Sequence, residues 1–236
     1  MGKKTKLFAI SIIVFAVGAI FFFGWNNNTS LLADEKNSTK GEIMKLPEPK
    51  FQSKISVEEA LSRRRSIRDY KEDSLSLEEI SQLLWSAQGV TAKWGGRTAP
   101  SAGALYPLEI YIVVGTVKGL KRGLYHYDPQ KHGISQKKEG DLREKLTEAS
   151  LGQDEILRAP ATLVITAVYE RTMKKYHERG IQYVHMEVGS AGENIYLQAE
   201  SLGLGTVFIG AFEDEEVKKV LGIEEEPLGI MPVGKK

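Results

Sequence analysis

A dense basic run at residues 63–68, reading RRRSIR, combines residue types that can bind a phosphate group. Arginine guanidinium groups form paired, charge-assisted hydrogen bonds with phosphate, and a hydroxyl such as that of Ser66 adds one more. The run also lies at the end of a predicted helix, where positive charge offsets the helix dipole. Two interpretations therefore stay open, a phosphate-binding cluster and a solvated, charged helix end.

Two further segments are rich in small residues. Residues 99–107 read APSAGALYP, and residues 203–211 read GLGTVFIGA. Solvent loops are usually more polar than this, and small side chains let backbone amides approach a flat polar ring. The plainer alternatives are an irregular loop before a strand and a buried edge strand after a helix. Taken with the basic run, the two segments predict a site for a phosphorylated aromatic cofactor, without a Walker or Rossmann glycine signature.

The composition excludes several other kinds of chemistry. The chain has no cysteine, which rules out disulfides, thiolate zinc sites, iron–sulfur clusters and cysteine nucleophiles. Its four histidines do not pair at HxH or HxxxH spacing, so we expect no metal site. No Ser-His-Asp set, paired carboxylate or HExxH motif supports hydrolysis. Without the three lysines nearest the N-terminus, the 32 basic residues fall to 29 against 31 acidic ones, so nucleic acid is not an expected partner.

The N-terminal segment predicts a membrane anchor. Residues 7–25 form 19 consecutive residues without a charge, about the length that crosses a bilayer core as a helix. Three lysines precede this run, so we expect an anchor at residues 1–30 with the body on the extracytoplasmic side. A cleaved signal, with secretion of the body, and a buried helix are the alternatives. Residues 31–54, which are polar and broken by two prolines, are then a predicted linker.

The body, residues 55–236, is long enough for one core and mixes helices and strands without strict βαβ alternation, so the predicted class is α+β. Two helices start at capping boxes, with Ser at the N-cap and Glu three residues later, and β-branched or apolar runs mark the strands. Helices are predicted at residues 56–65, 76–88, 142–149, 182–202 and 214–221. Strands are predicted at residues 108–115, 124–127, 134–136, 161–169, 206–209 and 228–233.

The helix at 182–202 is apolar on more than one face. Val184, Val188 and Ala191 begin one stripe at spacing three and four, and Gly189 lies among small residues on another side. Such a helix is either wrapped by its own domain or part of a homodimer core. Glu193 stands among apolar neighbours in it, so we expect this carboxylate to be awkwardly buried or held in a salt bridge.

In this order, the three segments resemble the motifs of the FMN-dependent nitroreductase family, and they are most similar to its SagB-type branch, which is related to azoline dehydrogenases. The second segment has the PSAGALYP form of that branch and lacks the Asn of ordinary nitroreductases. The resemblance covers residues 55–236 and includes the terminal strand with MPVG at 231–234. It implies a nitroreductase-like fold, with a central mixed sheet flanked by helices, the long helix in a homodimer interface, and FMN bound at that interface.

The resemblance also assigns the cofactor-binding residues. The basic run would hold the phosphate and ring edge, the small-residue loop would contact the ring, amides of the late glycine run would face N5 and O4, and a C-terminal lysine would add a charge. These residues are Arg64, Arg65, Ser66, Arg68, Pro100, Ser101, Ala102, Gly103, Ala104, Gly210, Ala211 and Lys235. The branch uses Lys and Tyr as a base, for which Lys174, Lys175, Tyr176 and Tyr183 are candidates by residue type only.

The implied activity is that of an FMN-dependent oxidoreductase. It would pass two electrons from a reduced donor such as NAD(P)H to a small organic acceptor, of the nitroaromatic or quinone type, by ping-pong exchange. The first alternative is SagB-type oxidation of peptide azolines to azoles, which involves partner proteins. The second is a membrane-tethered flavin-binding module without turnover. An extracytoplasmic body would be separated from NAD(P)H, and a quinol or a membrane partner would then be the donor.

Overall fold

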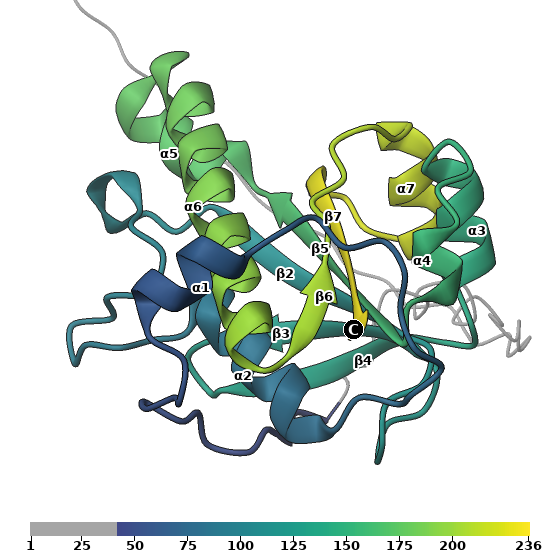
Figure 1. Ribbon diagram of the computed structural model, residues 1–236. Coiled ribbons are helices and arrows are strands. Elements are labelled where there is room, and N and C mark those ends of the chain that lie inside the picture. The colour runs from purple at the N-terminus through teal and green to yellow at the C-terminus, as the bar shows by residue number, and fades with distance from the viewer. Residues whose placement is uncertain (1–41) are drawn as a thin grey trace, which may run out of the picture. The chain divides into compact units, whose positions relative to one another are not determined.

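A seven-stranded sheet forms the centre of the computed structural model, which describes residues 42–236 (Figure 1). Its strands lie in the order β1-β4-β3-β2-β5-β7-β6, and each pair of neighbours is antiparallel. The strands are β1 (Met44–Lys45), β2 (Leu108–Val114), β3 (Gly123–Asp128), β4 (Gly133–Glu139), β5 (Ala161–Ala167), β6 (Leu204–Thr206) and β7 (Glu226–Lys235). The α+β class is confirmed. The expected mixed sheet is instead antiparallel between these strands, because no βαβ crossover joins neighbours in the described part of the chain.

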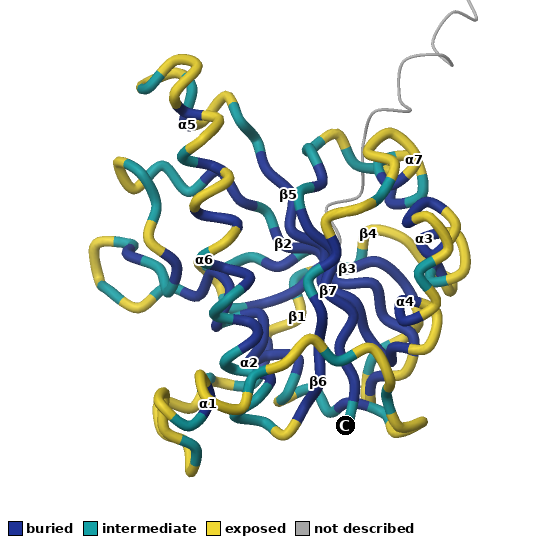
Figure 2. The backbone as a smooth tube through the Cα atoms, turned by 45° about the horizontal axis from the view of Figure 1, so that its top comes forward, coloured by how far each residue is buried: buried dark blue, intermediate teal, exposed yellow. Residues whose placement is uncertain are grey.

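Helices cover both faces of the sheet, because its central strands send alternate apolar side chains to opposite sides. In β2, Ile110 and Ile112 join one core cluster, and Tyr111 and Val113 join the other. Figure 2 shows the buried strands enclosed by the helices. The first cluster is covered by α2 (Leu77–Gln88) and α6 (Arg179–Ser201). Two further helices, α1 (Val57–Arg63) and α5 (Tyr169–Tyr176), pack against α6. The second cluster is covered by α3 (Arg143–Ala149), α4 (Glu155–Arg158) and α7 (Asp214–Leu221).

The two predicted capping boxes behave differently. At α2, Ser76 and Glu79 exchange side-chain-to-backbone hydrogen bonds in both directions, so this capping box is confirmed. At α1, the Ser56 side chain accepts from the Glu59 backbone, but the Glu59 carboxylate lies 2.6 Å from Arg63 instead of returning to the cap. The ion pair within α1 therefore replaces the second half of the box.

Some element boundaries differ from the sequence-based prediction. The long helix α6 begins at Arg179 rather than at residue 182, and α4 and α5 have no predicted counterpart. The strand expected at 206–209 is β6, which ends at Thr206. The Phe208 amide beyond it donates to the Tyr196 hydroxyl, 2.7 Å away, and so is not free to pair with a strand.

The second half of the predicted linker belongs to the folded domain. Leu46 is 3% exposed and lies in the main core cluster, and β1 pairs with β4. The Pro47 carbonyl accepts from Ser81, and the Lys50 amide donates to Gln82, so α2 holds this segment. The described part of this compact unit begins at residue 42, earlier than the predicted boundary at residue 55.

Within residues 42–236 no helix is long and apolar enough to cross a membrane. The predicted anchor at residues 1–30 lies outside the described residues.

Candidate functional site

The basic run and the late glycine run lie side by side at the β6 edge of the sheet. The Ile67 amide donates to the Thr206 carbonyl at 2.9 Å, and Ser66 pairs with Thr206 in an isolated parallel bridge. The Tyr196 hydroxyl of α6 lies 3.0 Å from Ser66 Oγ and 2.7 Å from the Phe208 nitrogen. Two of the three segments predicted to bind the cofactor are therefore in direct contact.

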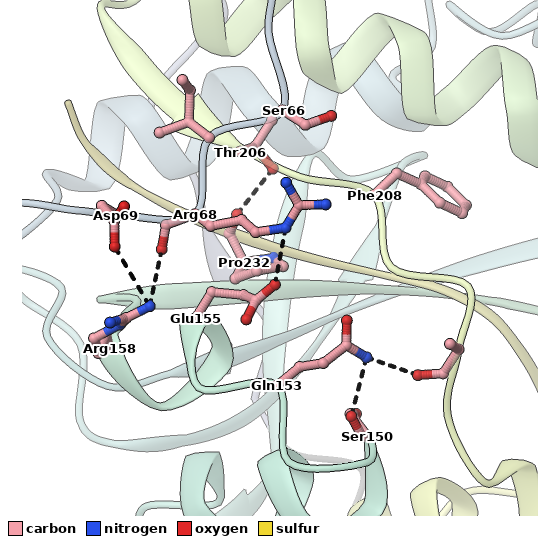
Figure 3. A network of polar contacts seen from close by, with 12 residues as sticks. Ser66, Arg68, Asp69, Ser150, Gln153, Glu155, Arg158, Thr206, Phe208 and Pro232 are labelled. Atoms are coloured by element: carbon pink, nitrogen blue, oxygen red, sulfur yellow. Dashed lines mark hydrogen bonds and ion pairs between the residues drawn. The ribbon is translucent and has the colours of Figure 1, made fainter.

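A second set of contacts ties the basic run to α4 (Figure 3). Arg68 Nε lies 3.4 Å from Glu155 Oε1, and Arg158 Nη2 lies 3.5 Å from Asp69 Oδ1. The Arg68 side chain is 58% exposed, whereas that of Glu155 is 10% exposed. The Arg68 side chain is thus more than half open to solvent while Glu155 fixes its position.

Gln153, in the loop before α4, is hydrogen-bonded to the late glycine run (Figure 3). Its Nε2 donates to the Ala211 carbonyl at 2.8 Å and to the Ser150 carbonyl at 3.0 Å. The neighbouring Gly210 is exposed, and a Cβ placed there would meet no atom within 4 Å. The backbone at Gly210 and Ala211 is therefore fixed in orientation and open to a ligand.

The Phe208 ring packs between α6 and β7, at two positions where glycine has no side chain to block it. A Cβ at Gly192 would lie 2.9 Å from Phe208 Cδ2, and one at Gly229 would overlap the far end of the same ring. This packing sets where the chain leaves β6 and enters the Gly210 segment.

Three other predicted ligands have partners of their own. Arg64 Nε lies 3.6 Å from Glu193, and the Arg64 guanidinium lies over the Tyr196 ring. The Arg65 guanidinium turns back to carbonyls of its own helix end, at 2.7 and 3.1 Å. The Lys235 ammonium pairs with Glu79 of α2, so a phosphate would compete with that carboxylate. The direct role of these residues stays a prediction.

The segment 99–107, here named the Pro-Ser loop, is held in an unusual backbone conformation. Gly103, Ala104 and Tyr106 have φ values of 63°, 54° and 46°, and the last two are residues that rarely adopt them. Ser101 Oγ accepts from the Tyr106 amide at 2.9 Å, and Arg171 of α5 donates to the Tyr106 carbonyl at 3.1 Å. Strain of this kind persists where surrounding contacts over-determine it, and it concentrates at functional sites.

A buried carboxyl group lies beneath the Pro-Ser loop. Glu187 of α6 is 3% exposed, and Gln88 Nε2 donates to its Oε1 at 3.3 Å. Burial raises the pKa of Glu187 to about 7, against a hydrogen bond from Ser101. The expectation for Glu193 is met in its salt-bridge form, since Glu193 pairs with Arg64 and its side chain is 45% exposed. The buried carboxylate of this helix is Glu187.

In the described part of the chain, the Pro-Ser loop and the basic run lie against different flanks of α6. Glu187 contacts the loop and Tyr196 contacts the basic run, and these residues are nine positions apart on α6. Nine residues make two and a half helical turns and about 13 Å of rise, so the two side chains leave opposite flanks of the helix.

The end of α5 packs on the Pro-Ser loop. A Cβ at Gly103 would lie 2.8 Å from the Tyr176 hydroxyl and 3.0 Å from Lys175 Nζ. The ring of Tyr176 also contacts that of Tyr183, with centroids 5.1 Å apart in an edge-on arrangement. Tyr176, Tyr183 and Lys175 therefore form one group at the loop.

The residues at the β6 edge fit a phosphorylated planar ligand. Ser66 and Arg68 are exposed, and the open backbone at Gly210 follows two residues after Phe208, whose amide is bonded to Tyr196. Tyr196 and Gln153, which position the basic run and the late glycine run, belong to no recognisable sequence motif. The one available signal was a tyrosine on the apolar stripe of a helix, since a buried phenol needs a polar partner.

Comparison with known proteins identifies the family of this chain. A model of the nitroreductase family matches residues 61–235. The chain is 47% identical over 196 residues to a protein of Methanocaldococcus jannaschii provisionally named a nitroreductase, with 83% of this chain and 98% of that protein covered. A crystal structure from Ralstonia eutropha, also provisionally named a nitroreductase, has a TM-score of 0.72 at 31% identity, covering 82% of this chain and 89% of that one.

A third similarity is to the Escherichia coli microcin synthetase McbBCD complex with truncated pro-MccB17 bound. Its TM-score is 0.65 at 26% identity, over 88% of this chain and 83% of that one. The family match spans most of the chain, and the M. jannaschii relative is covered almost completely. This chain belongs to the nitroreductase family.

Proposed function

We propose that this protein is an FMN-dependent oxidoreductase that transfers two electrons from a reduced donor such as NAD(P)H to a small organic acceptor of the nitroaromatic or quinone type. The observation that carries the proposal is the direct contact between the basic run and the late glycine run through Ser66, Thr206 and Tyr196. This contact brings an anion-binding group and an open backbone to one edge of the sheet.

The chain's own residues would bind and orient the cofactor. Ser66 and Arg68, with Arg64, would hold the phosphate by charge-assisted hydrogen bonds. The amides at Gly210 and Ala211, fixed by Gln153, would face the polar edge of the ring. When bound, FMN supplies the electron-accepting ring that such two-electron transfers need. A separate acid–base pair is not required for this chemistry.

We propose a homodimer on the basis of the two flanks of α6. The Pro-Ser loop and the phosphate-binding edge lie against opposite flanks of α6, so we propose that the loop of a second copy completes each site. The outer side of α6 offers a surface for that copy. Gly189 and Met186 are exposed there, and a groove of about 580 Å³ lies between α6, α2 and the segment before α1.

Absorbance of the purified full chain tests the proposal. We expect a flavin spectrum with about one FMN per chain, bleaching on addition of NADH, and recovery with a quinone or a nitroaromatic. Light scattering should give a dimer. A folded sample that stays colourless after incubation with FMN would contradict the cofactor. Bound flavin that no donor reduces would identify a binding module without turnover.

A second candidate is the oxidation of peptide azolines to azoles. The group at Gly103 favours it, because removal of two hydrogens from an azoline needs a base beside the ring, and Lys175 and Tyr176 lie against the loop. Similarity to a complex with bound pro-microcin supports a peptide substrate. Lys175→Met and Tyr176→Phe should then abolish azole formation, which is measured as the loss of mass from the peptide. Both variants should leave NADH-dependent quinone reduction intact. Equal loss of both activities would contradict this candidate.

A further inference from the structure

Tyr196 is a nearly buried tyrosine that touches three parts of the proposed cofactor site. Its side chain belongs to a residue only 9% exposed, on the flank of α6 that faces β6. Its hydroxyl lies 2.7 Å from the Phe208 nitrogen and 3.0 Å from Ser66 Oγ. The Arg64 guanidinium carbon lies 4.9 Å from the centre of its ring.

The donors and acceptors at this hydroxyl fix the direction of its hydrogen bonds. The Phe208 amide is only a donor, so the Tyr196 oxygen accepts there. The phenol proton then needs an acceptor, because an unpaired polar proton in a nearly buried position is costly. Ser66 Oγ is the other group within hydrogen-bond distance of this hydroxyl in the described part of the chain. Tyr196 therefore donates to Ser66.

This arrangement leaves the Ser66 hydroxyl proton free to point away from Tyr196. Ser66 is exposed, so its proton is directed to the outside of the β6 edge, where Arg68 also lies. A chain of hydrogen bonds running in one direction strengthens its last donor. The Arg64 side chain is held beside this donor by the Tyr196 ring and by Glu193.

We propose that Tyr196 is a positioning residue that aims the Ser66 hydroxyl and the Arg64 guanidinium at the phosphate of the cofactor, and that it thereby makes the site prefer a phosphorylated flavin. This inference rests on the proposed FMN site and adds the residue that sets its selectivity for the phosphate. The effect of Tyr196 on the flavin ring is small by comparison, because its hydroxyl reaches the ring segment only through the Phe208 amide.

The test compares FMN with riboflavin, which has the same ring and no phosphate. Full-length apo-protein is titrated with each flavin, and the dissociation constant is measured from quenching of flavin fluorescence. Tyr196→Phe keeps the ring and removes the hydroxyl. The matched control is Tyr125→Phe, a buried tyrosine on β3 whose hydroxyl donates to a backbone carbonyl at 2.9 Å. Strands β2 and β5 separate β3 from β7.

We expect Tyr196→Phe to weaken FMN binding about five- to tenfold, the value of one hydrogen bond between uncharged groups, and riboflavin binding less than about twofold. Tyr125→Phe should change neither. Ser66→Ala should weaken FMN binding to a similar degree, and the double variant Ser66→Ala/Tyr196→Phe should be no weaker than Ser66→Ala, because Tyr196 acts through Ser66.

Three results would overturn the inference. Equal weakening of both flavins by Tyr196→Phe would reveal a general structural role. Additive losses in the double variant would show that Tyr196 does not act through Ser66. Unchanged FMN binding in Tyr196→Phe would show that the hydroxyl is not needed. A wild-type protein that binds neither flavin would instead refute the proposed function itself, and the inference with it.

Discussion

Replacing Glu187 by Gln should remove a pH-dependent loss of stability. Burial raises the pKa of the Glu187 carboxyl from its ordinary value of 4.5 to about 7, against the hydrogen bonds from Ser101 and Gln88 that favour the ionised form. The folded chain therefore holds this proton more tightly than the unfolded chain. The resulting stabilisation is complete below pH 4.5 and is lost as the pH rises to about 7. A pKa difference of this size corresponds to about 3 kcal/mol.

Urea unfolding of the apo-proteins at pH 5 and pH 8 measures the effect. Gln keeps an acceptor for Gln88 and cannot ionise, so the free energy of unfolding of Glu187→Gln, relative to wild type, should rise by about 2–3 kcal/mol between these two pH values. The control is Glu170→Gln, the same change at an exposed position of α5, for which we expect less than about 0.5 kcal/mol. A difference between Glu187→Gln and wild type that stays constant with pH would refute the reasoning.

Arg64→Ala and Arg68→Ala should each weaken FMN binding by about 1.5–3 kcal/mol, the value of a charge-assisted contact. If both variants bind the flavin as tightly as wild type, the basic run is only a solvated, charged helix end. Gly229→Ala should lower the free energy of unfolding by about 1–3 kcal/mol, because the new methyl group overlaps the Phe208 ring; unchanged urea unfolding would contradict this packing. A Cβ at Gly189 would meet no atom within 4 Å in the single chain, so Gly189→Leu should leave the chain folded by circular dichroism and reduce the dimer fraction in light scattering; an unchanged dimer fraction would place Gly189 outside the interface. Protease added to intact spheroplasts should digest the body if residues 1–30 anchor it on the extracytoplasmic side, and a protected body would reverse the orientation.

Local signals in the sequence were sufficient for most of the fold. The capping box at Ser76 and the β-branched run of β2 each specify an element by short-range physics, and both elements are present. The linker prediction failed where tertiary contacts override local composition. Two prolines suggest a spacer, yet Leu46 is buried and the Pro47 carbonyl is bonded to α2. No periodicity within so short a segment could show that it pairs at the edge of a sheet.

The sequence was sufficient to predict which segments form the site, but not how their side chains are arranged relative to one another. The motifs name residues with the right chemistry, but the partner of each side chain depends on packing between distant elements. Glu193 and Glu187 lie six positions apart on one helix, and the apolar neighbours of Glu193 pointed to the wrong one as the buried carboxylate. Their fates differ because Arg64 reaches Glu193 at the surface, whereas Glu187 turns towards Gln88 and the Pro-Ser loop.

The junction of the Pro-Ser loop with α5 is where the two candidate activities separate. Quinone or nitroaromatic reduction needs an open ring face and no base, whereas azoline oxidation needs a proton acceptor held beside that face. Positive φ angles at Ala104 and Tyr106 cost about 1–3 kcal/mol each, and the bonds from Arg171 and Ser101 maintain them. Activity of the Tyr176→Phe variant on each substrate class distinguishes the two cases.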